Sequence, residues 1–208
     1  SGLKRIEDVS CLRNFQFAED MGPTSHAVKP KEYVAIDNFY TTTIYEKGAE
    51  LIRMLYVMLG KEKFMLGIAK YIERFDGKYA TTEDFVKAIE DGASLIDTEL
   101  GFNMEQFYLW YRKSGTPNII VKRELDLDSG NLILKFIQNN SNYDDLEKND
   151  PMVIPILFAE IGSNGKVYKE KLFILNKPSD YLVLKSDEAK KDLPLISLFR
   201  RFSSPVTW

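Results

Sequence analysis

The fold class of this chain is indicated by residues 110–121, which read Trp110-Tyr111-Arg112-Lys113-Ser114-Gly115-Thr116-Pro117-Asn118-Ile119-Ile120-Val121. Before this stretch, apolar residues recur every three or four positions, as on one face of an α-helix. After it, they alternate with polar residues, as in a strand with one buried face. Glycine and proline between the two patterns end the last helix. We therefore predict an α+β chain, with a helical part at 1–117 and a small antiparallel β-sandwich at 118–208.

The part before the boundary has the periodicity of amphipathic helices. We predict helices at about 4–16, 39–59, 61–75, 82–93 and 103–112. Apolar residues recur every three positions along the first helix and are expected to face the core, namely Ile6, Val9, Leu12 and Phe15. Gly60 is expected to end the second helix, and Thr81 with Asp84 to start the fourth in a capping-box arrangement.

The part after the boundary has the shorter period of β-strands. We predict strands at about 119–125, 132–136, 152–161, 167–175 and 181–184. The turn Asp128-Ser129-Gly130-Asn131 is expected to join the first two strands in a hairpin. Residues 139–150 are polar and acidic without a period, and we expect them to form a mobile connection.

Composition argues against several classes of protein. Lys and Arg total 28 against 31 Asp and Glu, which gives a net charge of -3 and no basic stretch to follow a phosphate backbone. Nucleic acid is therefore not an expected partner. No apolar run reaches the roughly 20 residues of a membrane helix, and the beginning of the chain does not read as a signal peptide. We therefore expect no membrane as a partner. The only cysteine, Cys11, cannot form an internal disulfide, which suits a reducing compartment, and we expect a cytoplasmic location.

The chain has few residues suited to catalysis. A hydrolytic zinc site needs three protein ligands, usually including two histidines on one helix face, and His26 is the only histidine. Motifs of serine hydrolases, nucleotide enzymes and thiol redox enzymes do not occur. His26, in a polar loop, is expected to be a hydrogen-bonding or surface residue, and Cys11 a small buried apolar residue. Tyr40 and Tyr45 flank three threonines, where a core aromatic and a phenol presented at a cleft are both consistent with the pattern.

One long segment resembles a known family. Residues 38–54 read Asn-Phe-Tyr-Thr-Thr-Thr-Ile-Tyr-Glu-Lys-Gly-Ala-Glu-Leu-Ile-Arg-Met, which is similar to the Asn-Phe-Tyr-Thr-x-Thr-x-Tyr-Glu-Lys-Gly segment of the zinc aminopeptidases of the aminopeptidase N (alanyl aminopeptidase) family. Shorter segments agree in the same order, at 15–20, 81–85, 110–117 and 203–206. The resemblance runs along almost the whole chain and looks closest to proteobacterial and apicomplexan members.

The resemblance implies roles for two tyrosines. Tyr45 matches the family tyrosine that donates its hydroxyl to the oxyanion of the tetrahedral intermediate. A phenol with a pKa near 10 stays protonated at neutral pH and suits that role. Tyr40 matches a residue that walls the pocket for the first side chain of the substrate. The resemblance also implies that 1–117 is the mostly helical C-terminal part of a thermolysin-like catalytic domain.

The family's zinc-binding motif is absent from this chain. Its ligands, two histidines of His-Glu-x-x-His and a downstream glutamate, are expected to lie upstream of Ser1, and a large C-terminal helical domain is missing as well. His26-Ala27-Val28-Lys29-Pro30 also departs from the His-Pro-Ile-Arg-Pro of many relatives. We therefore expect zinc and a peptide substrate in the full-length enzyme, with the missing catalytic half and helical domain as its partners. The isolated chain is expected to bind no zinc and to be inactive.

Two other interpretations stay open on the sequence. The chain can be a natural binding module that kept the fold without the metal site, in which case the native protein would have a mass of about 24 kDa. Alternatively, it has a purely structural role in which the sandwich only spaces domains.

Overall fold

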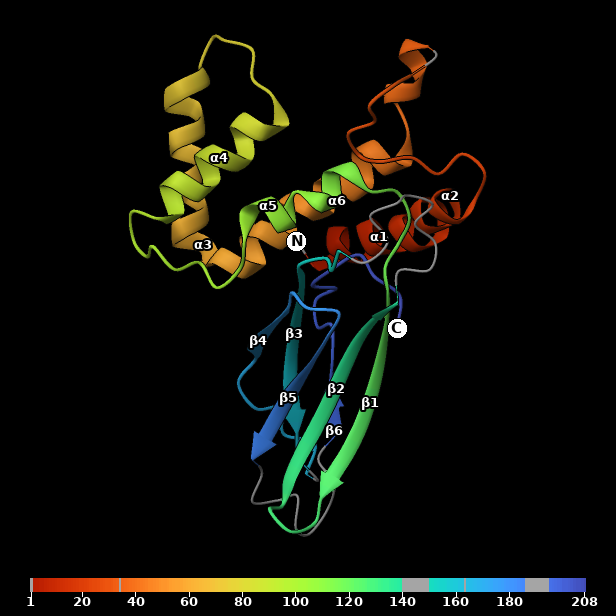
Figure 1. Cartoon of the computed structure of the whole chain (residues 1–208), viewed down its shortest axis with the longest axis vertical. Helices are drawn as coiled ribbons and strands as arrows, with labels where there is room; N and C mark the ends of the chain where they lie inside the picture. Colours follow the sequence, from red (N-terminus) through yellow and green to blue (C-terminus); the bar gives the residue numbers. More distant parts are fainter. Residues whose placement is uncertain (1, 34, 140–149, 163, 186–194) are drawn as a thin grey trace.

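The computed structural model describes residues 2–33, 35–139, 150–162, 164–185 and 195–208. Figure 1 shows the helices gathered at one end of an elongated β-sandwich. The helical elements are α1 (Gly2–Cys11), the π-helix η1 (Leu12–Gln16), α2 (Phe17–Met21), the 3₁₀-helix η2 (Ile36–Phe39), the π-helix η3 (Thr43–Lys47), α3 (Gly48–Phe75), α4 (Thr82–Ala93), α5 (Met104–Phe107) and α6 (Leu109–Arg112). Within the described ranges, no helix combines the length and apolar character that crossing a membrane requires.

The strands of the described ranges form two small antiparallel sheets. They are β1 (Asn118–Asp126), β2 (Asn131–Asn139), β3 (Ile154–Ile161), β4 (Lys171–Leu175), β5 (Ser179–Lys185) and β6 (Leu195–Ser197). One sheet has the order β1-β2-β5 and the other β4-β3-β6. Phe136 of the first sheet stacks on Phe173 of the second with ring centroids 5.3 Å apart, which closes the sandwich. The predicted α+β class, helices followed by an antiparallel sandwich, is confirmed.

The predicted strands are found with some differences. The hairpin pairs Asp126 with Asn131 and Asn118 with Asn139, as the turn residues predicted. The strand expected at 167–175 is shorter, because β4 begins at Lys171 and Val167 makes only an isolated bridge to Ile161. The strand β6 was not predicted, since its three residues are too few to show a period. Most of the connection expected at 139–150 lies outside the described residues.

The first predicted helix continues further than expected and changes its buried face. The π-helix η1 follows α1 directly and leads into α2, so the helical run extends to Met21. A π turn adds a residue to the helical repeat and rotates the side chains that follow it. Leu12 is buried as predicted, but the burial passes to Gln16 and Phe17 while Phe15 stays 62% exposed. The prediction that Ile6 and Phe15 face the core was wrong in this chain, where Ile6 is 68% exposed.

The predicted break at Gly60 is a sharp bend inside α3. Gly60 has φ 75° and ψ 168°, which interrupts the helical path between the two helices that the periodicity predicted. This positive φ is a conformation that glycine adopts without strain. The second half of α3 then packs against α4, where Gly67 and Gly92 bring the two backbones into close approach. The start of α4 has the predicted capping box, since the Asp84 amide donates to the Thr81 hydroxyl at 3.1 Å.

The helices and the sandwich share one hydrophobic core. Trp110 is 1% exposed, and its indole N–H donates to the Val153 carbonyl at 2.8 Å. The Gln106 amide donates to the carbonyls of Pro151 and Asn176, at 2.9 and 2.7 Å. These bonds satisfy carbonyls at the end of the sandwich nearest the helices, and they fix α5 and α6 on that end.

The approach of α3 and α4 makes a prediction about stability. A Cβ added at Gly92 would lie 2.4 Å from the Cα of Gly67. Gly92→Ala should therefore lower the free energy of unfolding by about 1–3 kcal/mol, the usual cost of overpacking, measured by urea denaturation. Gly48→Ala is the matched control, because Gly48 has φ −55° and the nearest atom to an added Cβ is 3.6 Å away. The control should leave stability unchanged or raise it by about 0.4–1 kcal/mol. Equal urea midpoints for the two variants would contradict this packing.

Candidate functional site

The segment that contains both candidate tyrosines is a tight turn followed by a π-helix. Tyr40 follows η2 and has φ −107° and ψ 49°, after which η3 begins at Thr43. Within η3, Thr43 and Lys47 point inward and are 0% and 1% exposed. Tyr45 lies on the opposite face and is 58% exposed. The segment is therefore anchored on one face and presents a tyrosine on the other.

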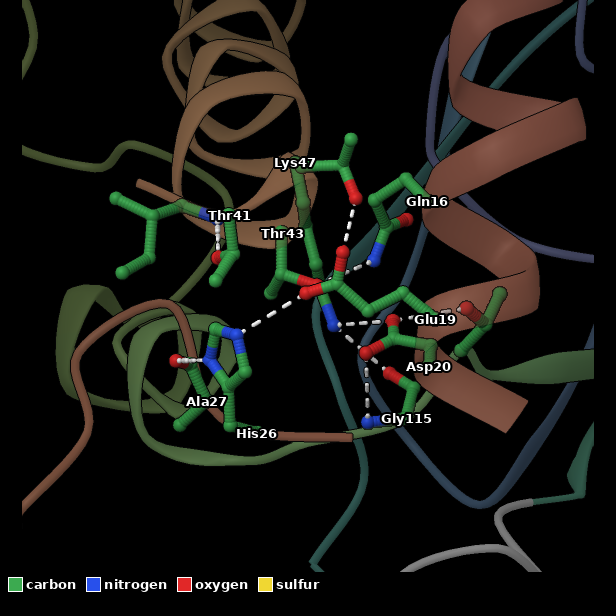
Figure 2. Close-up of polar contacts among 12 residues, drawn as sticks. Gln16, Glu19, Asp20, His26, Ala27, Thr41, Thr43, Lys47 and Gly115 are labelled. Carbon is green, nitrogen blue, oxygen red and sulfur yellow. Dashed lines mark hydrogen bonds and ion pairs between the residues drawn. The ribbon is translucent and has the colours of Figure 1, made fainter. Parts of the chain in front are cut away.

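The deepest anchor is an ion pair between Lys47 and Asp20. The Lys47 ammonium lies 2.9 Å from the Asp20 carboxylate and donates to the Gly115 carbonyl at 2.8 Å (Figure 2). Asp20 also accepts from the Thr116 hydroxyl at 3.0 Å and from the Gly115 amide at 3.3 Å. Burial lowers the pKa of the Lys47 ammonium, and the charge of Asp20 opposes that shift. Because both side chains are at most 1% exposed, the pair is stable only as long as both partners are present.

A second anchor begins one residue earlier, at Glu19. Its carboxylate accepts from the Thr42 hydroxyl and lies 3.1 Å from Nε2 of His26. The other ring nitrogen of His26 lies 2.8 Å from the Ala27 carbonyl oxygen. Figure 2 shows the ring of His26 between Ala27 and Glu19. The expectation that His26 is a hydrogen-bonding loop residue is thus confirmed by its contacts.

Hydrogen bonds hold the backbone between these anchors. The Gln16 amide donates to the Thr43 hydroxyl at 3.3 Å, in the interior of the protein. The Thr41 hydroxyl accepts from the Ile44 amide, and the Thr41 carbonyl accepts from the Tyr45 amide, both at 3.2 Å. The hydroxyls of three consecutive threonines thus hold the turn that leads to Tyr45.

Tyr40 and Tyr45 lie side by side on the surface of this segment. Their ring centroids are 6.4 Å apart and the ring planes differ by 27°. Tyr40 is 70% exposed, so neither ring belongs to the core. Among the described residues, the Tyr45 hydroxyl has no hydrogen-bond partner, which leaves its proton free to be donated to a ligand. Of the two alternatives the pattern left open, the core aromatic does not apply to either ring in this chain.

A pocket of about 600 Å³ opens beside Tyr40. Its lining includes Glu19, His26, Glu32, Tyr33, Asn38 and Tyr40. In the described part of the chain, no group of three His, Cys, Asp or Glu side chains could hold a metal ion. These residues therefore do not form a site for a hydrolytic zinc ion, which needs three protein ligands. The segment instead offers the Tyr45 hydroxyl as a hydrogen-bond donor and Tyr40 as a wall of the pocket.

Sequence reasoning missed the residues that anchor the two tyrosines. Glu19 and Asp20 end one of the segments that carried the family resemblance, and Lys47 lies inside another. Charged residues within otherwise apolar helical patterns were the available signal, since such residues are buried only when paired. Cys11, expected to be buried, is only half-buried.

Comparison with family models covers most of the chain. A model described as the peptidase family M1 domain matches residues 6–109, which is half of the chain. A second model, described as a domain of unknown function (DUF3458) with an Ig-like fold, matches residues 115–208. The two matches meet near the stretch where the helices give way to strands.

Individual relatives agree with these matches. Aminopeptidase N of Escherichia coli K12 is 39% identical over 165 residues, which are 79% of this chain and 18% of that protein. Aminopeptidase N of Caulobacter vibrioides is 36% identical over 206 residues, 99% of this chain and 23% of that protein. A crystal structure of Legionella pneumophila aminopeptidase A in complex with aspartic acid superimposes with a TM-score of 0.73 and 30% identity, over 88% of this chain and 19% of the other. The chain thus spans about a fifth of the length of these relatives.

The buried ion pair makes a prediction about stability. Asp20→Ala leaves the Lys47 ammonium buried without its counter-charge, and should destabilise the chain by about 3–5 kcal/mol in urea denaturation. The double variant Asp20→Asn with Lys47→Met should recover much of that loss, because it removes both charges. Glu73→Ala breaks the exposed ion pair with Lys70 and serves as the control, with no measurable change in the midpoint. An Asp20→Ala midpoint equal to that of the unaltered chain would contradict the anchoring role.

Proposed function

This chain belongs to peptidase family M1, and we propose that it is part of a longer zinc aminopeptidase that removes N-terminal amino acids from peptides. The predicted resemblance to aminopeptidase N is confirmed, and so is the similarity to proteobacterial members of the family. The similarity to apicomplexan members stays a prediction. Because the chain spans about a fifth of its relatives, the activity is proposed for the longer protein. The observation that carries the proposal is the exposed Tyr45, whose hydroxyl has no hydrogen-bond partner in the part of the chain that the structure describes.

The exposure of Tyr45 supports a role as a donor to a developing negative charge. Its ring is 58% exposed, while Thr43 and Lys47 on the other face of η3 are fully buried. A fixed O–H group aimed at an oxyanion stabilises the transition state more than the substrate, which is the condition for raising turnover. In this proposal Tyr45 donates its hydrogen bond to the oxyanion formed as the first peptide bond is attacked.

Tyr40 is proposed as a wall of the substrate pocket. It stacks near Tyr45 and lines the pocket of about 600 Å³, a volume within the range of small-molecule sites. An aromatic wall excludes water and contacts an apolar side chain. Its replacement is therefore expected to change the preference for the first residue of the substrate.

The remaining parts of the active site are proposed to lie outside this chain. Zinc is the proposed cofactor of the longer protein, where it would polarise the carbonyl and activate water. Apolar side chains stay exposed along α1 and η1, including Leu3, Ile6 and Phe15. We expect the upstream half of the catalytic domain to cover them. We also propose the division into 1–117 and 118–208 and a cytoplasmic location.

The role of Tyr45 can be tested in the longer enzyme. Tyr45→Phe removes only the hydroxyl and should lower kcat by about 10²–10³, the usual effect of losing one oxyanion donor. The zinc content, measured by metal analysis, should stay the same. Tyr79→Phe is the matched control, because Tyr79 is 98% exposed and no activity loss is expected there. Unchanged turnover in Tyr45→Phe would remove Tyr45 from the mechanism.

The isolated chain provides a separate test. Residues 1–208 should release no p-nitroaniline from alanine p-nitroanilide and should retain no stoichiometric zinc after dialysis, because the ligand set for zinc is not among the described residues. Activity or bound zinc in this chain would contradict the division of the site between two parts of a longer protein. A native product of about 24 kDa would instead favour the non-catalytic binding module.

A further inference from the structure

We propose that Glu19 and His26 form a positioning pair that holds Tyr45 in place through the Thr42 hydroxyl. This inference rests on the proposed function, because it assigns the two residues to the same reaction. Among the described residues, neither side chain forms a hydrogen bond with Tyr45. Their effect passes through the start of η3, where Thr42 directly precedes the first residue of the π-helix.

The contacts of His26 are hydrogen bonds only if a proton lies between its Nε2 atom and the Glu19 carboxylate. The Ala27 carbonyl oxygen lies 2.8 Å from Nδ1, and a Glu19 carboxylate oxygen lies 3.1 Å from Nε2. A carbonyl can only accept, so Nδ1 carries a proton. An ionised carboxylate can also only accept, so Nε2 either carries a second proton or receives one from a protonated Glu19. Either arrangement fixes one oxygen of Glu19 and turns the other toward Thr42.

Glu19 is thereby oriented to accept from the Thr42 hydroxyl. Its side chain is 18% exposed, so water competes little for this bond. The residues on either side of Thr42 are also held. The Thr43 hydroxyl accepts from the Gln16 amide, and the Thr41 carbonyl accepts from the Tyr45 amide. The position of Tyr45 therefore depends on a turn whose middle residue is fixed by Glu19.

This pair is separate from the anchor that holds the fold together. Asp20 and Lys47 connect α2 to the far end of η3 and to Gly115, and they are fully buried. Glu19 and His26 are partly exposed and line the pocket beside Tyr40, and among the described residues their side chains hydrogen-bond to each other, to Ala27 and to Thr42. Loss of the pair should change where the tyrosines point while leaving most of the folding energy in place.

The test uses the longer enzyme with variants at Glu19. Glu19→Ala should lower kcat by about 10- to 100-fold, the effect of misplacing a catalytic group by about 1 Å, with little change in KM. Glu19→Gln is the matched control, because its amide can accept from Thr42 and donate to a neutral His26. It should keep most of the activity. An equal loss in both variants would overturn a role based on hydrogen bonding.

A double variant decides whether Glu19 acts through Tyr45. In a Tyr45→Phe background the hydroxyl to be positioned is gone, so adding Glu19→Ala should lower kcat by less than about twofold. A full additional loss would overturn the proposal. Thr42→Ser should retain activity and Thr42→Val should not, because only serine keeps the hydroxyl. Equal activity of these two variants would also overturn it.

A spectroscopic measurement separates this proposal from the proposed function. In residues 1–208 with ¹³C-labelled tyrosine rings, Glu19→Ala should shift the NMR signals of Tyr40 and Tyr45 and leave those of Tyr181 in place. Tyr181 lies in β5 and serves as the internal reference. Unmoved Tyr45 signals would overturn the positioning role. If Tyr45→Phe keeps full turnover, Tyr45 has no part in the mechanism, and these signals alone still decide whether the pair positions the ring.

Discussion

The arrangement of this protein depends on the buried ion pair of Lys47 and Asp20. Taking two charges out of water is costly, and the cost is offset only when each charge finds several well-placed partners. Here the partners come from distant parts of the chain, since the pair joins α2 and the π-helix η3 to the backbone at Gly115. Gly115 lies at the passage from helices to sandwich. One interaction thus fixes the first helices, the tyrosine segment and the β-sandwich relative to one another.

Two π-helical turns lie where this network forms. One precedes α2 and ends at Gln16, and the other contains Tyr45 and ends at Lys47. The two π turns are joined by the hydrogen bond from the Gln16 amide to the Thr43 hydroxyl. A π turn is less favourable than an α turn and is usually retained where it places a side chain that an α-helix would misdirect. In this chain the side chains so placed are the anchors on the inside and Tyr45 on the outside.

The sequence predicted the fold class and the positions of most elements, because apolar periodicity and turn residues act locally. The hairpin at Asp126 and Asn131 and the capping box at Thr81 are examples. Periodicity failed at Phe15, where the π turn changes the helical repeat without any signature in the apolar pattern. The family resemblance supplied Tyr40 and Tyr45. The anchors at Glu19, Asp20 and Lys47 were missed because their partners lie up to 96 residues away, so a charged residue in a helical pattern does not show which residue it pairs with.

The core shared by α5, α6 and the sandwich has a consequence for how such proteins change over time. Sequence families divide near residue 115, as if two modules had been joined there. Trp110 and Gln106 nevertheless bind carbonyls of the second module, so the boundary of inheritance is not a boundary of folding. Exchange of the sandwich for that of a distant relative would therefore succeed only together with the helical residues that pack on it, which include α5 and α6 and also Phe17, packed on Phe202. The boundary between the two inherited modules thus runs through a single packed core, which also includes residues of α3 and α4.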